Sequence, residues 1–204
     1  MYWVAMSTDV AATRAYFGPR AAGWEDRFPD DAPRYARAVA ELAPQLGGVV
    51  LDAACGTGRA LPALRTAVGM TGAVIAIDVT AEMLAEAVRL GRDTHAALIL
   101  SDVTRLPLAT GSIDAVFAAG LVSHLNDPVA GLAELARVCR VGGRLALFHP
   151  IGRAQLAARH GHALDGDDVR AGANIHRALA ESGWRCELLD DADDRYLALA
   201  VRIP

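Results

Sequence analysis

The chain has 204 residues, of which 53% are hydrophobic and 22% charged, and its formal net charge is −4. This composition favours one globular domain with a sizeable core and excludes a disordered chain. The slightly acidic balance offers no basic surface for nucleic acid, and no apolar run approaches the roughly 18 residues of a membrane span. We therefore expect a protein that binds neither nucleic acid nor membranes.

The basic residues and the cysteines limit the kinds of catalytic, disulfide and metal sites that this chain could contain. All 20 basic residues are arginine, so catalysis by a lysine is excluded. The three cysteines, Cys55, Cys139 and Cys186, are too few and too scattered for a disulfide framework or a zinc site, and they favour a reducing, cytoplasmic location. The six histidines lack the spacing of metal ligands, so we expect no metal.

The first predicted element is a helix over residues 32–45. Asp31 is placed to cap this helix, and Pro33 suits its first turn. The residues at helical spacing that should face inward are Tyr35, Val39, Leu42 and Leu46.

Five apolar runs then alternate with helical patterns, which predicts βαβ units and a mainly parallel sheet. One helix should follow the first strand to about residue 68, and another should start at Thr80. A third should start at Asp127-Pro128 and stop at Gly142-Gly143. The predicted strands cover residues 49–53, 73–77, 97–100, 113–118 and 144–149.

The last part of the chain follows a different pattern. The polar stretch 160–168 is interpreted as a loop, and a helix is expected near 168–182. Two strand-like runs, 184–189 and 196–203, flank a short polar segment and predict an antiparallel hairpin. The predicted fold class is therefore α/β, a Rossmann-like doubly wound sheet of five parallel strands plus a C-terminal antiparallel hairpin.

The most informative motif is the segment Val49–Gly58. It is typical of a buried strand that ends near Asp52 and continues into the turn Gly56-Thr57-Gly58. Glycines after a strand let the backbone turn sharply and approach a ligand where a β-carbon would collide. Asp52 is placed at the carboxyl end of the strand, where open α/β sheets bind their ligands.

Asp52, Asp78 and Asp102 each follow an apolar strand, one βα unit apart. In a doubly wound sheet the first three strands are neighbours, so these carboxylates should gather along one edge. A carboxylate can accept hydrogen bonds from both ribose hydroxyls, and another can accept from an adenine amino group. The three residues therefore predict a cofactor that contains a nucleoside.

A nicotinamide dinucleotide is the first alternative for such a cofactor. Its fingerprint requires Gly or Ala three residues after Gly58, and this chain has Leu61 there. Asp52 would also place negative charge beside the pyrophosphate. Both observations disfavour a nicotinamide oxidoreductase.

Four motifs between Ala22 and His149 resemble those of the class I S-adenosylmethionine-dependent methyltransferases, particularly the small-molecule branch of the quinone-biosynthesis C-methyltransferases. The resemblance implies the strand order 3-2-1-4-5-7-6. It also implies in-line transfer of a methyl group from S-adenosyl-L-methionine to a small-molecule acceptor. The motifs are Val50–Gly58, Ile75–Asp78, Leu100–Val103 and Glu134–Arg144.

The resemblance assigns the methionine and ribose parts of the cofactor to particular residues. Asp52 and the turn from Gly56 to Gly58 should approach the methionine part, and Asp78 should hold the ribose hydroxyls. Ala54 stands where the family has its first motif glycine. Its methyl group should be tolerated, at some expense of cofactor affinity.

The resemblance also places the adenine and the sulfonium. Val79 and Met83 should line the adenine, although Met83 also suits the core side of a helix. Asp102 should face the adenine amino group, helped by the backbone of Val103. The residues just past the fourth strand that should flank the sulfonium are Ala119 and Gly120.

The candidate substrate residues are Tyr16, Arg20, His124 and His149. His124 and His149 follow the fourth and fifth strands, and either is a candidate general base. The alternative for each is a structural role, which for His124 would be a hydrogen bond that anchors its loop. Tyr16 and Arg20 belong to an N-terminal segment that should fold over the cofactor.

We expect one methyltransferase domain over residues 1–204. Its parts would be an N-terminal helical segment at 1–46, a cofactor-binding core at 47–149, and a small cap with the last helix and hairpin at 150–204. A non-catalytic S-adenosylmethionine-binding or scaffold protein on the same fold is the alternative function, because a fold does not determine an activity. The oligomeric state stays open between monomer and homodimer.

Overall fold

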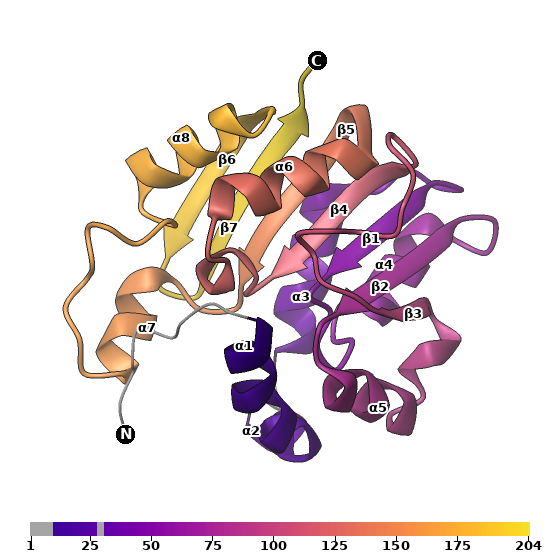
Figure 1. Ribbon diagram of the computed structural model, residues 1–204, viewed down its shortest axis with the longest axis horizontal. Helices are drawn as coiled ribbons and strands as arrows, with labels where there is room; N and C mark the ends of the chain where they lie inside the picture. Colours follow the sequence, from indigo (N-terminus) through magenta and orange to yellow (C-terminus); the bar gives the residue numbers. More distant parts are fainter. Residues whose placement is uncertain (1–9, 28–30) are drawn as a thin grey trace.

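The computed structural model describes residues 10–27 and 31–204, and the described residues form a seven-stranded β-sheet with helices on both faces (Figure 1). The strands are β1 Val49–Ala53, β2 Ala73–Asp78, β3 Ala97–Leu100, β4 Ile113–Ala119, β5 Cys139–His149, β6 Trp184–Ala192 and β7 Arg195–Arg202. Their order is β3-β2-β1-β4-β5-β7-β6, with β1 to β5 parallel and β7 antiparallel to β5 and β6. The predicted fold class and strand order are confirmed.

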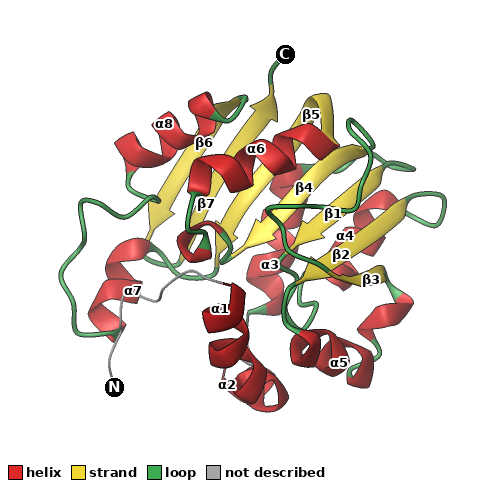
Figure 2. Ribbon diagram, viewed as in Figure 1, coloured by secondary structure: helices red, strands yellow, loops and turns green. Residues whose placement is uncertain are grey.

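Helices cover both faces of the sheet (Figure 2). They are α3 Ala32–Leu42, α4 Leu61–Val68, α5 Ala81–Arg89, α6 Pro128–Val138 and α8 Gly172–Glu181. On one face, Leu42 of α3 and Leu64 of α4 belong to the same buried cluster as Phe117 of β4. On the other face, Leu135 of α6 joins the cluster that contains Val116. Because neighbouring residues of β4 are buried on opposite faces, its sequence is apolar almost throughout.

A further group of helices lies near the carboxyl edge of the sheet. It comprises α1 Val10–Phe17, the 3₁₀-helix η1 Gly18–Gly23, α2 Trp24–Arg27 and α7 Arg153–Arg159. Figure 1 shows α1 and α2 beside α5, close to the arrowheads of the parallel strands. Arg14 Nε of α1 donates a 2.8 Å hydrogen bond to the carbonyl oxygen of Val79, just past β2. Residues 1–9 and 28–30 of the predicted N-terminal segment lie outside the described residues.

Helix α3 departs from the sequence prediction at both ends. Asp31 forms no side-chain cap, because its carboxylate accepts a 3.2 Å hydrogen bond from Arg59 instead. At the other end Ala43 adopts a left-handed φ of 51°, which ends the helix at Leu42, earlier than predicted. Leu46, which was predicted to face inward, is therefore 74% exposed.

The glycine pair Gly142-Gly143 lies inside β5 and does not stop a helix. Helix α6 ends at Val138, and the chain passes directly into β5. A β-carbon at Gly143 would lie 2.7 Å from the carbonyl oxygen of Asp114 on β4, so glycine is needed for the close approach of these strands. The prediction for this pair was wrong because Gly143 is required by the pairing of β4 with β5 rather than by the end of a helix.

The predicted ends of the other helices and of the hairpin strands are confirmed in part. Helix α6 starts at Pro128 as predicted, and Asp127 caps it, since its Oδ1 accepts a 2.9 Å hydrogen bond from the Ala130 amide. Thr80 precedes α5 but forms no side-chain cap. The hairpin strands extend further than predicted and leave a shorter turn between Ala192 and Arg195. In the two described ranges, every helix is too short or too polar to cross a lipid bilayer.

Candidate active site

A cavity of about 420 Å³ opens at the carboxyl edge of β1, β2, β4 and β5, and its volume is within the range of small-molecule sites. Side chains of α1 and α2 form part of its wall. The predicted site residues that line it are Tyr16, Asp52, Ala54, Gly56, Asp78, Val79, Met83, Val103, Ala119, Gly120, His124 and His149. The predicted site residues that do not line it are Gly58, Asp102 and Arg20.

Asp52, at the end of β1, is buried and unpaired. The residue is 1% exposed, and neither carboxylate oxygen has a hydrogen-bond partner among the described residues. Burial, and then the nearby charge of Asp78, raise the pKa of Asp52 to about 8. Because a buried polar group without a partner is destabilising, this carboxyl group requires a cationic or hydrogen-bond-donating ligand.

Asp78, at the end of β2, is also buried but is held by backbone donors. Its Oδ2 accepts a 2.8 Å hydrogen bond from the Gly56 amide, and its Oδ1 accepts one of 2.8 Å from the Thr80 amide. Burial raises the pKa of Asp78, and these hydrogen bonds oppose the shift. Since each carboxylate oxygen has more than one acceptor site, Asp78 can still bind ligand hydroxyls. The bond to Gly56 also fastens the glycine turn to the end of β2.

The turn after β1 uses left-handed backbone angles at alternate residues. Ala54, Gly56 and Gly58 have φ values of 60°, 55° and 82°. Ala54 therefore adopts a conformation that strains a residue with a β-carbon. At Gly58 a β-carbon would lie 2.7 Å from the side chain of Leu61, so this glycine permits the turn to pack against α4.

Asp102 and Arg20 do not line the cavity, and each has a local partner. Asp102 Oδ1 accepts a 2.9 Å hydrogen bond from the Thr104 amide, while the neighbouring Val103 lines the cavity. The Arg20 guanidinium lies 4.0 Å from the ring centroid of Tyr16 and donates to its carbonyl oxygen at 2.6 Å. The predicted ligand contacts of Asp102 and Arg20 stay predictions.

Glu25 fastens the N-terminal segment to the glycine turn, and sequence reasoning missed it. Its carboxylate accepts hydrogen bonds from Thr57 Oγ1 at 2.6 Å, Arg59 Nε at 3.0 Å and Arg92 Nη2 at 2.8 Å. Burial raises the pKa of Glu25, but the hydrogen bonds from Arg92 and Thr57 and the charges of Arg59 and Arg92 outweigh it and lower the pKa to about 2. These residues lie 32 to 67 positions from Glu25, and no spacing in the sequence links them.

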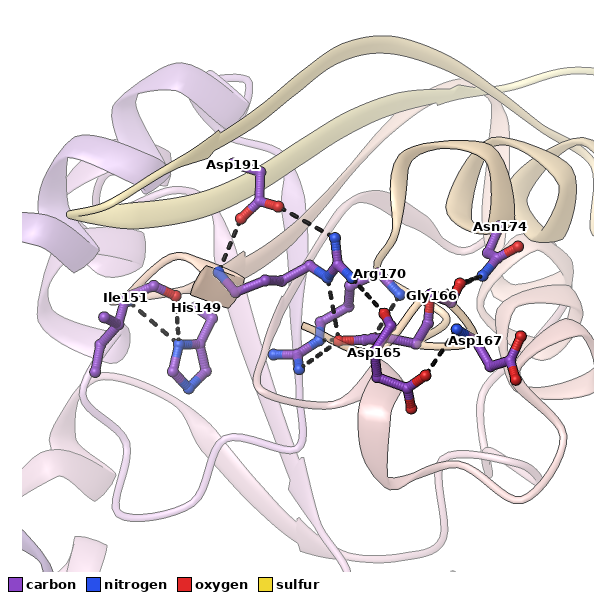
Figure 3. A network of polar contacts seen from close by, with 10 residues as sticks. His149, Ile151, Asp165, Gly166, Asp167, Arg170, Asn174 and Asp191 are labelled. Atoms are coloured by element: carbon purple, nitrogen blue, oxygen red, sulfur yellow. Dashed lines mark hydrogen bonds and ion pairs between the residues drawn. The ribbon is translucent and has the colours of Figure 1, made fainter. Parts of the chain in front are cut away.

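His149, at the end of β5, lines another part of the cavity, and the backbone holds its ring (Figure 3). Its Nδ1 lies 2.8 Å from the carbonyl oxygen of Ile151 and 3.2 Å from the Ile151 amide nitrogen. We assign the proton to Nδ1 from the shorter contact, which leaves Nε2 as a hydrogen-bond acceptor. Burial lowers the pKa of His149 to about 4, and the hydrogen bond to Ile151 opposes this only in part.

His124 ends the 3₁₀-helix η3 Val122–His124, between β4 and α6. Its ring packs edge-on against Phe17 of α1, with ring centroids 5.3 Å apart. Burial, and then the charge of Arg170, lower the pKa of His124. Both candidate histidines are therefore neutral near pH 7.

Arg170 is a second site residue that sequence reasoning missed. It is 9% exposed and lines the cavity together with both histidines. Asp168 accepts from its Nε at 3.1 Å and from its Nη2 at 2.9 Å, and Arg153 pairs with the same carboxylate at 3.1 Å. Figure 3 shows Arg170 within this polar network, near His149. The polar stretch that was interpreted as a loop thus supports part of the cavity wall.

The fold and the cavity together define a class of protein. Doubly wound sheets bind their ligands outside the carboxyl ends of the strands, and carboxylates on two adjacent strands suit a ligand that contains a nucleoside. The described part of the chain contains no group of three or more His, Cys, Asp or Glu side chains that could hold a metal ion. The molecule is therefore an α/β protein with a site for a small, nucleoside-bearing ligand.

Sequence comparisons narrow this class. Residues 51–147 match the family described as "Methyltransferase domain". The chain is 40% identical over 106 residues to a demethylmenaquinone methyltransferase of Beutenbergia cavernae. The aligned segment covers 52% of this chain and 42% of that protein. It is also 41% identical over 105 residues to an uncharacterized 37.1 kDa protein in transposon TN4556 of Streptomyces fradiae. This second aligned segment covers 51% of this chain and 30% of that protein. The match thus spans less than half the length of these relatives.

Solved structures share the fold over nearly the whole chain. A SAM-dependent methyltransferase from Aquifex aeolicus has a TM-score of 0.70 at 22% identity, over 96% of this chain and 99% of that one. A putative methyltransferase in complex with the Haloferax volcanii Trm112 activator has a TM-score of 0.73 at 20% identity, over 93% and 96%. The resemblance to class I S-adenosylmethionine-dependent methyltransferases that was predicted from the sequence is confirmed, over residues 51–147 by the family match and over nearly the whole chain by the fold.

Proposed function

We propose that this chain transfers a methyl group from S-adenosyl-L-methionine to a small-molecule acceptor. The observation that carries the proposal is Asp52, a buried carboxylate without a partner among the described residues, in the wall of the cavity next to Asp78. The methionine part of this cofactor carries an ammonium and a sulfonium group, which complement an unpaired carboxylate in charge. The residues therefore fit the cofactor.

The residues that would hold the cofactor follow β1, β2 and β3. Asp52 and the turn at Gly56 would hold the methionine part, and Asp78 would hold the ribose hydroxyls. When bound, the cofactor supplies an activated methyl group, so the protein need not prepare the electrophile. The cavity-lining residues that would surround the adenine are Val79, Met83 and Val103.

The acceptor would occupy the part of the cavity past β4 and β5, where Ala119 and Gly120 would flank the reacting centre. We assign His149 as the general base, because the contact with Ile151 engages Nδ1 and leaves Nε2 as an acceptor. Nε2 would take the proton of the acceptor O–H or N–H as that atom bonds to the methyl carbon. The side chains of α1 and α2 would exclude water and orient the acceptor.

The domain plan and the location belong to the same proposal. Residues 1–46 would cover the site, 47–149 would bind the cofactor, and 150–204 would complete the acceptor end within one domain. The scattered cysteines support action in the cytoplasm, and the acidic composition supports a partner other than nucleic acid. A scaffold protein on this fold would need no general base, so the position of His149 favours an enzyme.

Two measurements test the proposed function. Calorimetric titration with S-adenosylmethionine and with S-adenosylhomocysteine should show binding of both, and Asp78→Ala should weaken it. Absence of binding to either would contradict the proposal, and binding of NADH instead would indicate an oxidoreductase. Turnover with a panel of phenols, amines, quinones and carboxylic acids should then yield a methylated product by mass spectrometry. Cofactor binding without any product across the panel would support the scaffold alternative.

A further inference from the structure

We infer that the methyl acceptor carries a carboxylate on an apolar body, separate from the O–H or N–H that is methylated, and that Arg170 binds this carboxylate at the end of the cavity away from Asp52. The inference rests on the proposed function, because it concerns the acceptor of that same site. Its basis is the separation of charge along the cavity, the orientation of the Arg170 guanidinium, and a recess beside Tyr196.

The acidic side chains of the cavity lining lie at one end of the cavity, and two arginines lie at the other end. The acidic residues of the lining, at the end formed by β1, β2 and the N-terminal segment, are Asp31, Asp52 and Asp78. Arg59 also lies at that end, where it pairs with carboxylates of the N-terminal segment. The other end, past β4 and β5, has Arg159 and Arg170 beside His124, His149 and His160, and within the described ranges no carboxylate lines it. A cationic ligand group is therefore favoured at the first end and an anionic group at the second.

Hydrogen bonds hold the Arg170 side chain in place and leave one guanidinium nitrogen, Nη1, available to a ligand. Asp168 accepts hydrogen bonds from Nε and Nη2, and no hydrogen bond donated by Nη1 is found in the described part of the chain. Asp168 does not line the cavity, and it is shared with Arg153, which also pairs with Asp191 at 3.4 Å. The positive charge of Arg170 lowers the pKa of His149, so its field reaches this part of the cavity. A fixed guanidinium of this kind is suited to a charge-assisted hydrogen bond with a carboxylate.

A recess of about 10 Å³ adjoins the cavity next to Arg170. It shares Ser123, His149 and Arg170 with the main cavity and is bounded by Tyr196, whose buried hydroxyl has no hydrogen-bond partner among the described residues. Burial raises the pKa of Tyr196, so the hydroxyl keeps its proton and can donate it in a hydrogen bond. The recess is about large enough for one water molecule, and hence for one oxygen atom. One oxygen of a carboxylate would meet Tyr196 there, and the other would meet Arg170.

The rest of the acceptor end is apolar. Hydrophobic side chains of α1, of the loop after β4 and of the segment around α7 form its wall, namely Phe17, Leu121, Leu125, Ile151 and Leu156. A molecule that is polar throughout would lose hydration against these side chains without a matching gain. The cavity therefore favours one anionic group on an apolar body over a sugar or another fully polar acceptor.

Matched acid and amide probes test this inference on the full chain saturated with S-adenosylhomocysteine. The probes are benzoate with benzamide and hexanoate with hexanamide, titrated by calorimetry or by ligand-observed NMR. In each pair the acid should bind about 10-fold more tightly than the amide, as expected for a charge-assisted contact. Arg170→Gln should abolish that preference without changing the affinity for S-adenosylhomocysteine. Arg177→Gln, an exposed residue of α8, is the matched control and should change neither affinity.

The inference is overturned if the acids bind no better than the amides, or if Arg170→Gln leaves their preference in place. If Arg170→Gln lowers the thermal midpoint, Arg170→Lys decides instead: a retained preference supports the inference, and a lost preference overturns it. Failure of the wild-type protein to bind S-adenosylhomocysteine would count against the proposed function alone. The acid–amide comparison is then repeated on the cofactor-free protein, where Arg170→Gln must still abolish the preference.

Discussion

The two ends of the cavity are built in different ways. At the cofactor end, Asp52 lies near the end of β1 and Asp78 ends β2, so the position of each is given by its own strand. At the acceptor end, His124 and Arg170 come from two separate connections and His149 ends β5, and all three meet α1 across the cavity. The first end is determined by the order of the strands, whereas the second depends on side-chain contacts between distant segments.

This difference indicates how each end should respond to substitution. Neighbouring strand ends stay together whenever the sheet forms, so a side chain there can be changed without moving the others. The acceptor end and the N-terminal cover depend on ion pairs such as Arg153–Asp168 and Arg92–Glu25. We therefore expect large losses of cofactor affinity from single changes at the first end, and smaller effects on order and closure from changes in the ion pairs.

The largest expected effect is that of Asp52→Asn. The amide cannot pair with the ammonium group of the cofactor, so the dissociation constant for S-adenosylmethionine should rise about 10³-fold, about 4 kcal/mol. Binding to the wild-type protein at pH 7 should also release a proton, because the cationic ligand favours the ionised form of a carboxyl group whose pKa is about 8. Calorimetry in buffers of different ionisation enthalpy measures both quantities.

The stability of the Asp52 variant separates charge from packing. The pKa of Asp52 is raised from 3.8 to about 8, so between these values the folded state holds a proton that the unfolded state has released. The free energy of unfolding of the wild-type protein therefore falls as pH rises through this window. Asp52→Asn should remove that slope and be more stable than wild type at pH 8, with little difference at pH 4. If the variant and the wild-type protein were equally stable at pH 4 and also at pH 8, the raised pKa of buried Asp52 would be contradicted.

The next effect in size concerns the acceptor end. His149→Gln should lower kcat about 10²-fold, because the general base is lost, and should leave cofactor affinity unchanged. The neutral imidazole is the active form, and its pKa is about 4, so kcat should fall with decreasing pH near 4 rather than near 6.5. Steady-state kinetics with any acceptor found in the panel measures the separation of kcat from KM.

His124→Gln is the control for this prediction. His124 contacts Phe17 of α1 and so is expected to affect KM more than kcat. Equal losses of kcat in both variants would show that the assignment of the base to His149 is wrong. An unchanged kcat in His149→Gln would show that the acceptor needs no base.

Much of the fold was readable in the sequence because local patterns determine it. Strands β1 and β3 have the predicted bounds, since Gly48 precedes one apolar run and Ser101 follows the other. Predictions for individual side chains failed where a distant partner competed with the local one. Asp31 was predicted as a helix cap but pairs with Arg59, and Gly143 serves the approach of β4 to β5.

The candidate site was predictable at one end only. Strand-end residues such as Asp52 and Asp78 line the cavity as expected, because the topology of the sheet brings them together. Glu25 and Arg170 were missed, since each acts through partners or cavity walls that only the folded chain assembles. Asp102 differs again, because a local hydrogen bond to the Thr104 amide engages its carboxylate.

A smaller effect is expected from Glu25→Gln, which removes the charge that fastens the N-terminal segment. Amide hydrogen exchange of residues 10–27 should become faster, and cofactor should bind about 5-fold more weakly, about 1 kcal/mol. The pKa of Glu25 is lowered from 4.5 to about 2. In the wild-type protein the stabilisation by the ionised carboxylate is therefore complete above pH 4.5 and is lost as the pH falls toward 2. Asp26→Asn, an exposed residue of the same helix, is the control and should leave exchange unchanged.

The smallest expected effect is that of Ala54→Gly, and it tests whether the cofactor end contains backbone strain. Ala54 has a φ of 60°, so glycine should raise the free energy of unfolding by about 1 kcal/mol, with cofactor binding slightly tighter because the methyl group lines the cavity. Ala43→Gly is the matched control, since Ala43 has a φ of 51° after α3 and does not line the cavity. It should give a similar gain in thermal unfolding and no change in affinity. A loss of stability in Ala54→Gly beside a gain in Ala43→Gly would mean that packing of the Ala54 methyl group outweighs the strain of its backbone.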